Sequence, residues 1–204
     1  MKVLYGTTNQ AKLDSMKRIT KSLGLEVIGL NELNQPLPEV EENGATPLEN
    51  AEIKARAYYK AFSMPVFSCD SGLYFDGIED ALQPGVHTRR VNGKELTDDE
   101  MIAYYAGLAE KHNNQLVGRY RNAIYFMLDD TTCFSSMDDA LATEPFILVS
   151  KPHEKRIEGF PLDSLSIDIA TGKYYYDLEE KTVDQSAVEQ GFRAFFEKAL
   201  AGWI

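Results

Sequence analysis

Cysteine is scarce in this chain of 204 residues, which contains only Cys69 and Cys133. Two cysteines are too few for the disulfide framework of a secreted domain of this length. Long apolar runs are missing as well, since no stretch approaches the roughly 18 consecutive apolar residues of a membrane helix. The N-terminal residues also lack the apolar core of a signal peptide. These absences predict a cytoplasmic protein without a membrane partner.

Basic residues are in the minority, with 21 Lys and Arg against 32 Asp and Glu, which gives a formal net charge of -11. Such a surface repels nucleic acid polymers at long range and predicts no such partner. It does not exclude a small anion such as a nucleotide, because a local basic pocket with a metal ion can outweigh the mean field. His87, His112 and His153 show no ligand spacing and predict no histidine metal site.

What the chain does contain is the pattern of an α/β fold in a single domain over residues 1–204. Residues 3–5 predict a strand, and the apolar spacing over 10–23 predicts a helix that ends at Gly24. Residues 26–30 predict a second strand. This strand–helix–strand order favours a parallel pair with a right-handed crossover.

Capping signals extend the pattern along the chain. Thr46 and Glu49 form a capping box, with Pro47 at the first helical position. Thr97 and Glu100 form a second capping box. Strand and hairpin signals after the third helix make the expected sheet a mixed one. The expected elements are helices from Thr46 to Pro65, from Thr97 to Lys111 and from Asp184 to Leu200, strands at 66–69 and 73–75 joined by a turn at 70–72, strands over 116–149 with a hairpin at 129–131, and two short strands flanking 170–172.

The first candidate site is the segment between the first strand and the first helix. Free backbone N–H groups and the positive end of a helix dipole meet there, which suits phosphate binding. Thr7, Thr8 and Asn9 add short polar groups, and the Lys12 ammonium can reach back from one turn inside the helix. The alternative interpretation is that Asn9 only caps the helix and Lys12 is a solvated surface charge.

The second candidate is the acidic loop that contains Glu39, Glu41 and Glu42. Neighbouring carboxylates repel one another unless water or a cation separates them. Mg²⁺ prefers one or two carboxylates together with water and phosphate oxygens. The loop therefore predicts a magnesium site or, alternatively, an ordinary solvated acidic surface.

Asp70 is the third candidate, because a carboxylate at a strand end before a Ser71-Gly72 turn can bind a metal or act as a general base. An ordinary Asp-Ser-Gly turn is the alternative. Asn50 and Lys54 are a fourth candidate, because they lie one helical turn apart and could face the same site. Such a lysine is also often solvated.

Together, the order and spacing of these segments resemble the inosine triphosphate pyrophosphatases, or non-canonical purine nucleoside triphosphate pyrophosphatases. That family combines a T/S-x-N-x-x-K start, a Glu-x-x-Gly loop, an E-N-A-x-x-K-A helix and a D-S-G-L segment. The resemblance covers nearly the whole chain and thins after residue 95. The matching motifs are TTNQAK at 7–12, EENG at 41–44, ENAEIKA at 49–55 and DSGL at 70–73, followed by PGV at 84–86, Arg90 and GRY at 118–120.

The resemblance implies a long mixed central sheet with two lobes around a nucleotide-binding cleft, a homodimer, and Mg²⁺-dependent hydrolysis of a nucleoside triphosphate to a monophosphate and pyrophosphate. It implies catalytic roles for Asp70, which would orient or activate water, and for Lys54, which would hold phosphate as Lys12 does. Glu41 and Asp70 would serve the metal. The implied substrate-binding residues are Thr7, Thr8, Asn9, Lys12, Ser71, Phe160 and Asp163.

Three departures from the family pattern fall on the substrate side. Cys69 replaces the acidic residue that usually precedes D-S-G-L, and a thiol is a poor Mg²⁺ ligand. Leu162 replaces the aromatic residue of the F-G-[YW]-D-P segment. The family's Ser-His-Arg is absent from residues 186–191, where Glu189 would reverse the charge that meets a 6-keto purine.

These departures leave two interpretations of the function. The first is a nucleoside triphosphate pyrophosphatase with an altered base preference, because a site that loses hydrogen-bond donors loses discrimination. The second is a nucleotide-binding sensor or partner protein that has lost turnover. The retained lysines and carboxylates favour the enzyme, whereas Cys69 and the missing Ser-His-Arg favour the binding protein.

Overall fold

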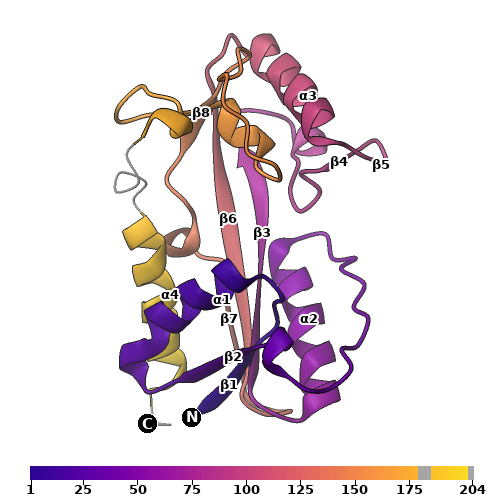
Figure 1. Ribbon diagram of the computed structural model, residues 1–204, viewed down its shortest axis with the longest axis vertical. Helices are drawn as coiled ribbons and strands as arrows, with labels where there is room; N and C mark the ends of the chain where they lie inside the picture. Colours follow the sequence, from indigo (N-terminus) through magenta and orange to yellow (C-terminus); the bar gives the residue numbers. More distant parts are fainter. Residues whose placement is uncertain (179–184, 202–204) are drawn as a thin grey trace. The chain divides into compact units, whose positions relative to one another are not determined.

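The computed structural model describes residues 1–178 and 185–201. They divide into two compact units, and strands β3 (Val66–Phe75) and β6 (Leu116–Met127) contribute residues to both. Figure 1 shows the elements of each unit. Of the described residues, the first unit comprises 1–71, 121–142 and 186–201, and the second comprises 72–120, 143–178 and 185.

The first unit begins with the parallel strands that the sequence predicts. β1 (Lys2–Tyr5) pairs in parallel with β2 (Glu26–Gly29) and also with the start of β3. α1 (Gln10–Thr20) connects β1 to β2, and α2 (Pro47–Phe62) connects β2 to β3. Gly24 ends the first crossover with a left-handed φ of 67°, which glycine adopts at little cost. The predicted strand–helix–strand start is confirmed.

Alternation along β1 divides the core of this unit between two faces. Val3 and Tyr5 pack in one cluster with the apolar side of α1, whereas Leu4 packs in another cluster with α2. α4 (Gln185–Ala199) packs into the same cluster as α1, and Figure 1 shows these two helices together, opposite α2. Asp184, the predicted first residue of the last helix, lies outside the described residues.

β3 differs from its prediction. The sequence predicts two strands separated by a turn at 70–72, but the structure has one continuous strand. A Cβ on Gly72 would lie 3.0 Å from the backbone of Gly85, and Gly85 exchanges two backbone hydrogen bonds of 2.9 Å with Leu73. The glycine therefore permits a close backbone approach and does not form a turn. As a result, Asp70 lies within a strand and not at its end.

The hairpin predicted at 129–131 is confirmed. The end of β6 pairs in antiparallel register with β7 (Cys133–Ser136). Asp129 stabilises the turn, because its Oδ1 accepts hydrogen bonds of 2.8 Å from the backbone N–H groups of Thr131 and Thr132. A local side-chain interaction thus determines where the strand reverses.

The second unit contains the other ends of β3 and β6. The start of β6 pairs antiparallel with β8 (Phe146–Leu148), which pairs antiparallel with β9 (Ser166–Asp168). α3 (Asp98–Lys111) packs its apolar side into one cluster with these strands. The second short strand expected after 170–172 is only an isolated bridge at Tyr174, because a short 3-10 helix begins at the next residue.

The two predicted capping boxes differ in the structure. At α3, Thr97 and Glu100 form both hydrogen bonds of the box, as predicted. At α2, the Glu49 N–H donates to Thr46 Oγ1 at 3.2 Å, but the Glu49 carboxylate accepts from the N–H of Ala45 at 2.6 Å. The box at α2 is therefore only half formed, although the Glu49 N–H of the first turn still has a partner.

Within residues 1–178 and 185–201, the main sheet has the strand order β2-β1-β3-β6-β8-β9, with β7 paired to β6. It is parallel at the start and antiparallel afterwards, so the predicted long mixed sheet is confirmed. A separate antiparallel pair is formed by β4 (Arg90–Val91) and β5 (Lys94–Glu95). Over the same described residues, no helix combines the length and the apolar character that a membrane crossing needs. Short 3-10 helices occur at Lys21–Leu23, Leu30–Glu32, Asp80–Leu82, Asp139–Leu141, Pro161–Ser164 and Tyr175–Asp177.

Candidate active site

Asp70 lies at the centre of a polar cluster in the first unit. Its Oδ2 accepts a hydrogen bond of 3.1 Å from the Asn50 amide, and its Oδ1 accepts one of 3.3 Å from the Lys54 ammonium. Asn50 and Lys54 lie four residues apart on α2 and are only 3% and 9% exposed. The prediction that these two side chains face one site is confirmed, and that site contains Asp70.

Lys54 also contacts a second carboxylate, because its Nζ lies 2.6 Å from Oε2 of Glu42. Burial lowers the pKa of Lys54, but the negative charges of Asp70 and Glu42 more than offset this effect and raise the pKa above its ordinary value. The ammonium therefore stays charged at neutral pH, although the Lys54 side chain is only 11% exposed.

The loop before α2 places Glu42 beside Lys54. Gly44 anchors this loop, because its backbone N–H donates a hydrogen bond of 2.8 Å to the Asn50 side chain, and a Cβ on Gly44 would lie only 2.8 Å from the same oxygen. Glu41, the predicted metal ligand, is exposed. Of the two adjacent glutamates, Glu42 is the one whose carboxylate contacts Lys54, and the role of Glu41 stays a prediction.

The segment from β1 to α1 lies at the N-terminus of α1, as predicted. Asn9 caps the helix, since its Oδ1 accepts a hydrogen bond of 3.1 Å from the N–H of Lys12, and its own N–H donates to Thr7 Oγ1 at 3.2 Å. The carbonyl of Thr8 accepts a hydrogen bond from the Asn31 side chain at 2.9 Å. Lys12 is exposed. The capping interpretation of Asn9 is confirmed, and phosphate binding by this segment stays a prediction.

Cys69 precedes Asp70 in β3 but packs against a different group of residues. Successive residues of a strand point to opposite faces, and Cys69 packs against the core cluster of α1 and α4, which includes Tyr5, whereas Asp70 faces α2. Burial raises the pKa of the Cys69 thiol to about 12. The structure thus gives Cys69 a packing role, and the weaker magnesium site that its thiol implies stays a prediction.

Ser71 is bound to a residue that no motif connects with the site. Its hydroxyl donates a hydrogen bond of 2.6 Å to Asn122 Oδ1 in β6, and Asn122 Nδ2 donates one of 2.7 Å to the carbonyl of Leu141. Asn122 follows Ser71 by 51 residues, so local spacing carries no signal for this pair. Sequence reasoning gave no role to Asn122, whereas it named Glu42 only as one of three carboxylates in the acidic loop.

Residues 186–191, where the resemblance places base recognition, take part in helix packing. The carboxylate of Glu189 forms an ion pair with Arg18 of α1. A Cβ on Gly191 would overlap the carbonyl oxygen of Ala140, so a longer side chain fits there only if α4 moves. The charge of Glu189 is thus neutralised inside the first unit.

Phe160 and Asp163 line one pocket of about 220 Å³ in the second unit. Phe160 is 59% exposed, whereas Leu162 between them is 4% exposed and packs in the core cluster of α3. Burial raises the pKa of Asp163 above its ordinary value. The predicted pair is brought together, while Leu162 offers little surface to a bound ring. The other lining residues are Thr88, Arg89, Met101, Tyr120, Gly159, Pro161 and Leu162 itself.

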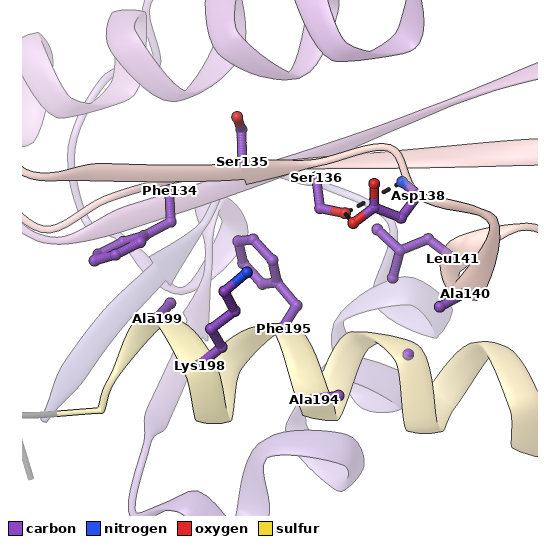
Figure 2. A pocket seen from close by; sticks show the side chains of 11 residues that line it. Phe134, Ser135, Ser136, Asp138, Ala140, Leu141, Ala194, Phe195, Lys198 and Ala199 are labelled. Atoms are coloured by element: carbon purple, nitrogen blue, oxygen red, sulfur yellow. Dashed lines mark hydrogen bonds between the residues drawn. The ribbon is translucent and has the colours of Figure 1, made fainter.

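A further pocket of about 370 Å³ lies in the first unit between β7 and α4. Figure 2 shows the rings of Phe134 and Phe195 on its apolar side, and Ser136 hydrogen-bonded to Asp138 on its polar side. Lys198 extends from α4 toward β7 (Figure 2). Among the described residues that line it, none is a predicted catalytic, substrate-binding or metal residue.

Comparison with known proteins identifies the family. Residues 3–141 match the Ham1 family, and this segment contains the complete cluster around Asp70. The chain belongs to the Ham1 family. The match ends before Phe160 and Asp163, in agreement with the thinning of the sequence resemblance toward the C-terminal half. The predicted family resemblance is confirmed.

Several relatives of this Ham1-family chain are named dITP/XTP pyrophosphatase. The protein of Anaeromyxobacter dehalogenans (strain 2CP-C) is 37% identical over 120 residues, which cover 58% of this chain and 50% of the relative. That of Aquifex aeolicus (strain VF5) is 43% identical over 90 residues, or 44% of this chain and 42% of the relative. The chain thus spans about half the length of these relatives. A Vibrio cholerae protein is 29% identical over 150 residues, or 71% of this chain and 73% of the relative.

Solved structures of the Ham1 family share this fold. The Staphylococcus aureus Ham1 protein superimposes with a TM-score of 0.76 at 22% identity, covering 97% of this chain and 99% of its own. A HAM1 protein from Coxiella burnetii gives a TM-score of 0.75 at 23% identity, covering 100% of this chain and 98% of its own. At these identities the likeness establishes the fold alone, including the long mixed sheet.

Proposed function

We propose that this Ham1-family chain hydrolyses a nucleoside triphosphate to a nucleoside monophosphate and pyrophosphate. The observation that carries the proposal is the buried ammonium of Lys54, held between the carboxylates of Glu42 and Asp70. A triphosphate repels a nucleophile until positive charge neutralises it, and Lys54 supplies such a charge where water screens it little. The names of the relatives support the same reaction.

Phosphate binding is assigned to the N-terminus of α1 and to two lysines. The free N–H groups that follow Asn9 and the positive end of the helix dipole attract an anion. Thr7 and Thr8 add hydroxyl donors beside them, and Lys12 is exposed one turn inside the helix. Lys54 would bind phosphate from α2.

Asp70 is assigned the role of orienting or activating the attacking water. Asn50 and Lys54 each bind a different oxygen of its carboxylate, so its orientation is restrained. A general base must lie within hydrogen-bond reach of the proton that it takes, and the Asp70 side chain, at 19% exposed, is still accessible to water. The Ser71 hydroxyl links β3 to β6 through Asn122. Direct substrate binding by Ser71, which the resemblance implies, stays a prediction.

Mg²⁺ is the cofactor that this reaction implies, and the carboxylates of the site fit it. Glu42 and Asp70 approach the same ammonium from a loop and a strand, and Mg²⁺ prefers one or two carboxylates with water and phosphate oxygens. No cluster of three or more His, Cys, Asp or Glu side chains suited to a metal occurs among the described residues, so the substrate would supply further ligands. The ion, when bound, would polarise phosphate and acidify bound water. The resemblance predicts Glu41, together with Asp70, as the metal ligand, and that assignment stays a prediction.

Base recognition is proposed to differ from a strict preference for inosine. Phe160 and Asp163 supply a ring surface and a hydrogen-bond acceptor in the second unit, whereas Glu189 and Gly191 supply no cationic donor for a 6-keto oxygen. A site without such donors discriminates weakly. We expect a preference for inosine triphosphate over ordinary purine triphosphates below about a thousandfold in kcat/KM, or about 4 kcal/mol.

The test is a panel of nucleoside triphosphates with Mg²⁺, scored by release of pyrophosphate. Wild type is expected to release pyrophosphate from at least one of them. Lys54→Met should lose at least about a hundredfold in kcat/KM, whereas Lys60→Met, at an exposed position of the same helix, should retain the wild-type value. Binding of triphosphates without release of pyrophosphate would refute hydrolysis and support a nucleotide-binding sensor or partner protein instead.

A homodimer in the cytoplasm completes the proposal. The dimer follows from the family resemblance, and the location follows from the composition of the chain. Sedimentation velocity at micromolar protein concentration is expected to show a species of twice the mass of the 22.9 kDa chain. A monomer over that range would contradict the dimer without affecting the assignment of the active site.

A further inference from the structure

Tyr58 continues the row of α2 side chains that forms the cluster around Asp70. Asn50, Lys54 and Tyr58 follow one another at intervals of four residues, which places them on one face of a helix. The first two bind Asp70 directly. Tyr58 therefore lies one turn beyond Lys54 on the same face.

The ring of Tyr58 lies against the loop that leads into α1. A Cβ on Gly6 would lie 2.7 and 2.9 Å from Cδ2 and Cε2 of Tyr58. Gly6 is itself held to β3, because its backbone N–H donates a hydrogen bond of 2.8 Å to the carbonyl of Phe67. Only glycine allows this approach without displacing the ring. Tyr58 thus lies between the loop at Gly6, which its ring contacts, and Lys54, one turn before it in α2.

The hydroxyl of Tyr58 lies in the field of both charges of the cluster but has no protein partner among the described residues. Burial raises its pKa, while the charge of Lys54 lowers it and that of Glu42 raises it, so the phenol is neutral and protonated. A partly buried hydroxyl without a partner is a donor available to a ligand. Beside the charge of Lys54, the acceptor that suits this donor is an anionic oxygen.

We propose that the Tyr58 hydroxyl binds a phosphate oxygen of the substrate, between the α1 loop at Gly6 and the ammonium of Lys54. The inference rests on the proposed function, because it names a further binding residue of the same site. Tyr58 would bind the part of the nucleotide that every triphosphate shares and would leave the choice of base unchanged.

The decisive variant is Tyr58→Phe, which keeps the ring against Gly6 and removes only the hydroxyl. Loss of one hydrogen bond to a charged oxygen should raise KM for a nucleoside triphosphate, and Kd for magnesium pyrophosphate by calorimetry, by about tenfold each. The value of kcat, the ratio between bases and the melting temperature should stay near wild type. Tyr59→Phe is the matched control, because its side chain projects about 100° away around the helix.

The outcomes separate this inference from the proposed function. If wild type binds pyrophosphate but hydrolyses no triphosphate, the proposed hydrolysis fails, and weaker pyrophosphate binding by Tyr58→Phe still supports the inference. Unchanged KM and Kd in Tyr58→Phe would overturn the inference even if hydrolysis is observed. A lower melting temperature with unchanged affinities would also overturn it, because the hydroxyl would then have only a structural role.

Discussion

Replacement of Lys54 by methionine tests whether its ammonium stabilises the folded protein by separating the carboxylates of Asp70 and Glu42. The Lys54 side chain is 11% exposed and lies between Asp70, at 19%, and Glu42, at 45%. Methionine keeps most of the buried volume of the lysine stem, so the main change is the loss of the ammonium. Two carboxylates would then remain side by side without a cation, and we expect a lower free energy of unfolding.

The magnitude follows from the exposure of each pair. For Asp70, a distance of 3.3 Å gives a gross attraction of about 5 kcal/mol at an effective dielectric constant of about 20. Desolvation of the buried ammonium opposes most of this gain. Glu42 is nearly half exposed, so its contact contributes below about 1 kcal/mol. We therefore expect Lys54→Met to lower the free energy of unfolding by about 1–3 kcal/mol.

The assay is a double-mutant cycle of Lys54→Met and Asp70→Asn, followed by urea denaturation at pH 7. We expect a coupling energy of at least about 1 kcal/mol. The exposed pair Arg193 and Glu197, with side chains 50% and 53% exposed, serves as the control, and a cycle there should couple by only about 0.3–0.5 kcal/mol. Additive effects of Lys54→Met and Asp70→Asn would refute the reasoning.

The contribution of the Lys54–Asp70 pair to the free energy of unfolding should depend on pH in a defined direction. The pKa of Lys54 is raised above its ordinary value of 10.5 in the folded protein. Its contribution to stability is therefore fully present below the unfolded pKa and is lost as pH rises through the folded pKa. The stability difference between wild type and Lys54→Met should stay constant from neutral pH to about pH 10 and shrink only above it.

Three other predictions follow from single residues. Gly191→Ala should lower the free energy of unfolding by about 1–3 kcal/mol in urea denaturation, because its Cβ would meet the carbonyl of Ala140. Gly107→Ala is the control, because a Cβ there would have nothing within 4 Å, and it should raise the free energy of unfolding by about 0.5–1 kcal/mol. Ser68→Ala should leave stability unchanged or raise it by up to about 1 kcal/mol, because the Ser68 hydroxyl is buried without a partner among the described residues, and a loss above about 1 kcal/mol would contradict this view. Burial raises the pKa of Asp163, so its ionised form destabilises the folded protein at pH 7. Asp163→Asn should therefore have a higher free energy of unfolding than wild type at pH 7, and this difference should shrink as pH falls toward 3.8. A difference that stays constant with pH would contradict this prediction.

The parts of the fold that could be predicted from the sequence are those with local causes. The first crossover ends at Gly24 because its left-handed backbone suits glycine. The helix at Thr97 begins there because two side chains within three residues satisfy its free N–H groups. The turn at Asp129 forms for a similar reason. In each case the atoms that determine the conformation lie within one turn of the chain.

The errors arise where a distant residue decides the conformation. Gly72 has the composition of a turn, but its strand continues because Gly85 approaches it from thirteen residues away. The two glutamates of the acidic loop cannot be ranked from sequence, since the hydrogen bond between Gly44 and Asn50 selects the one that contacts Lys54. The motifs therefore predict where the candidate site lies, whereas the contacts within it depend on the folded chain.

Glu189 and Gly191 lie in the segment where the resemblance places base recognition, and both hold α4 in place. The sequence indicates that the cationic residues expected at 186–191 are missing, and the structure supplies a physical reason. Gly191 lets α4 approach the carbonyl of Ala140 more closely than any side chain allows, and Glu189 holds the same helix to Arg18. Both residues fix α4 in place, so the base preference proposed above would depend on positions that the packing of this helix also uses. Helix packing thus occupies both positions, whereas the charges of the cluster around Asp70 come from α2, from β3 and from the loop before α2, and take no part in that packing.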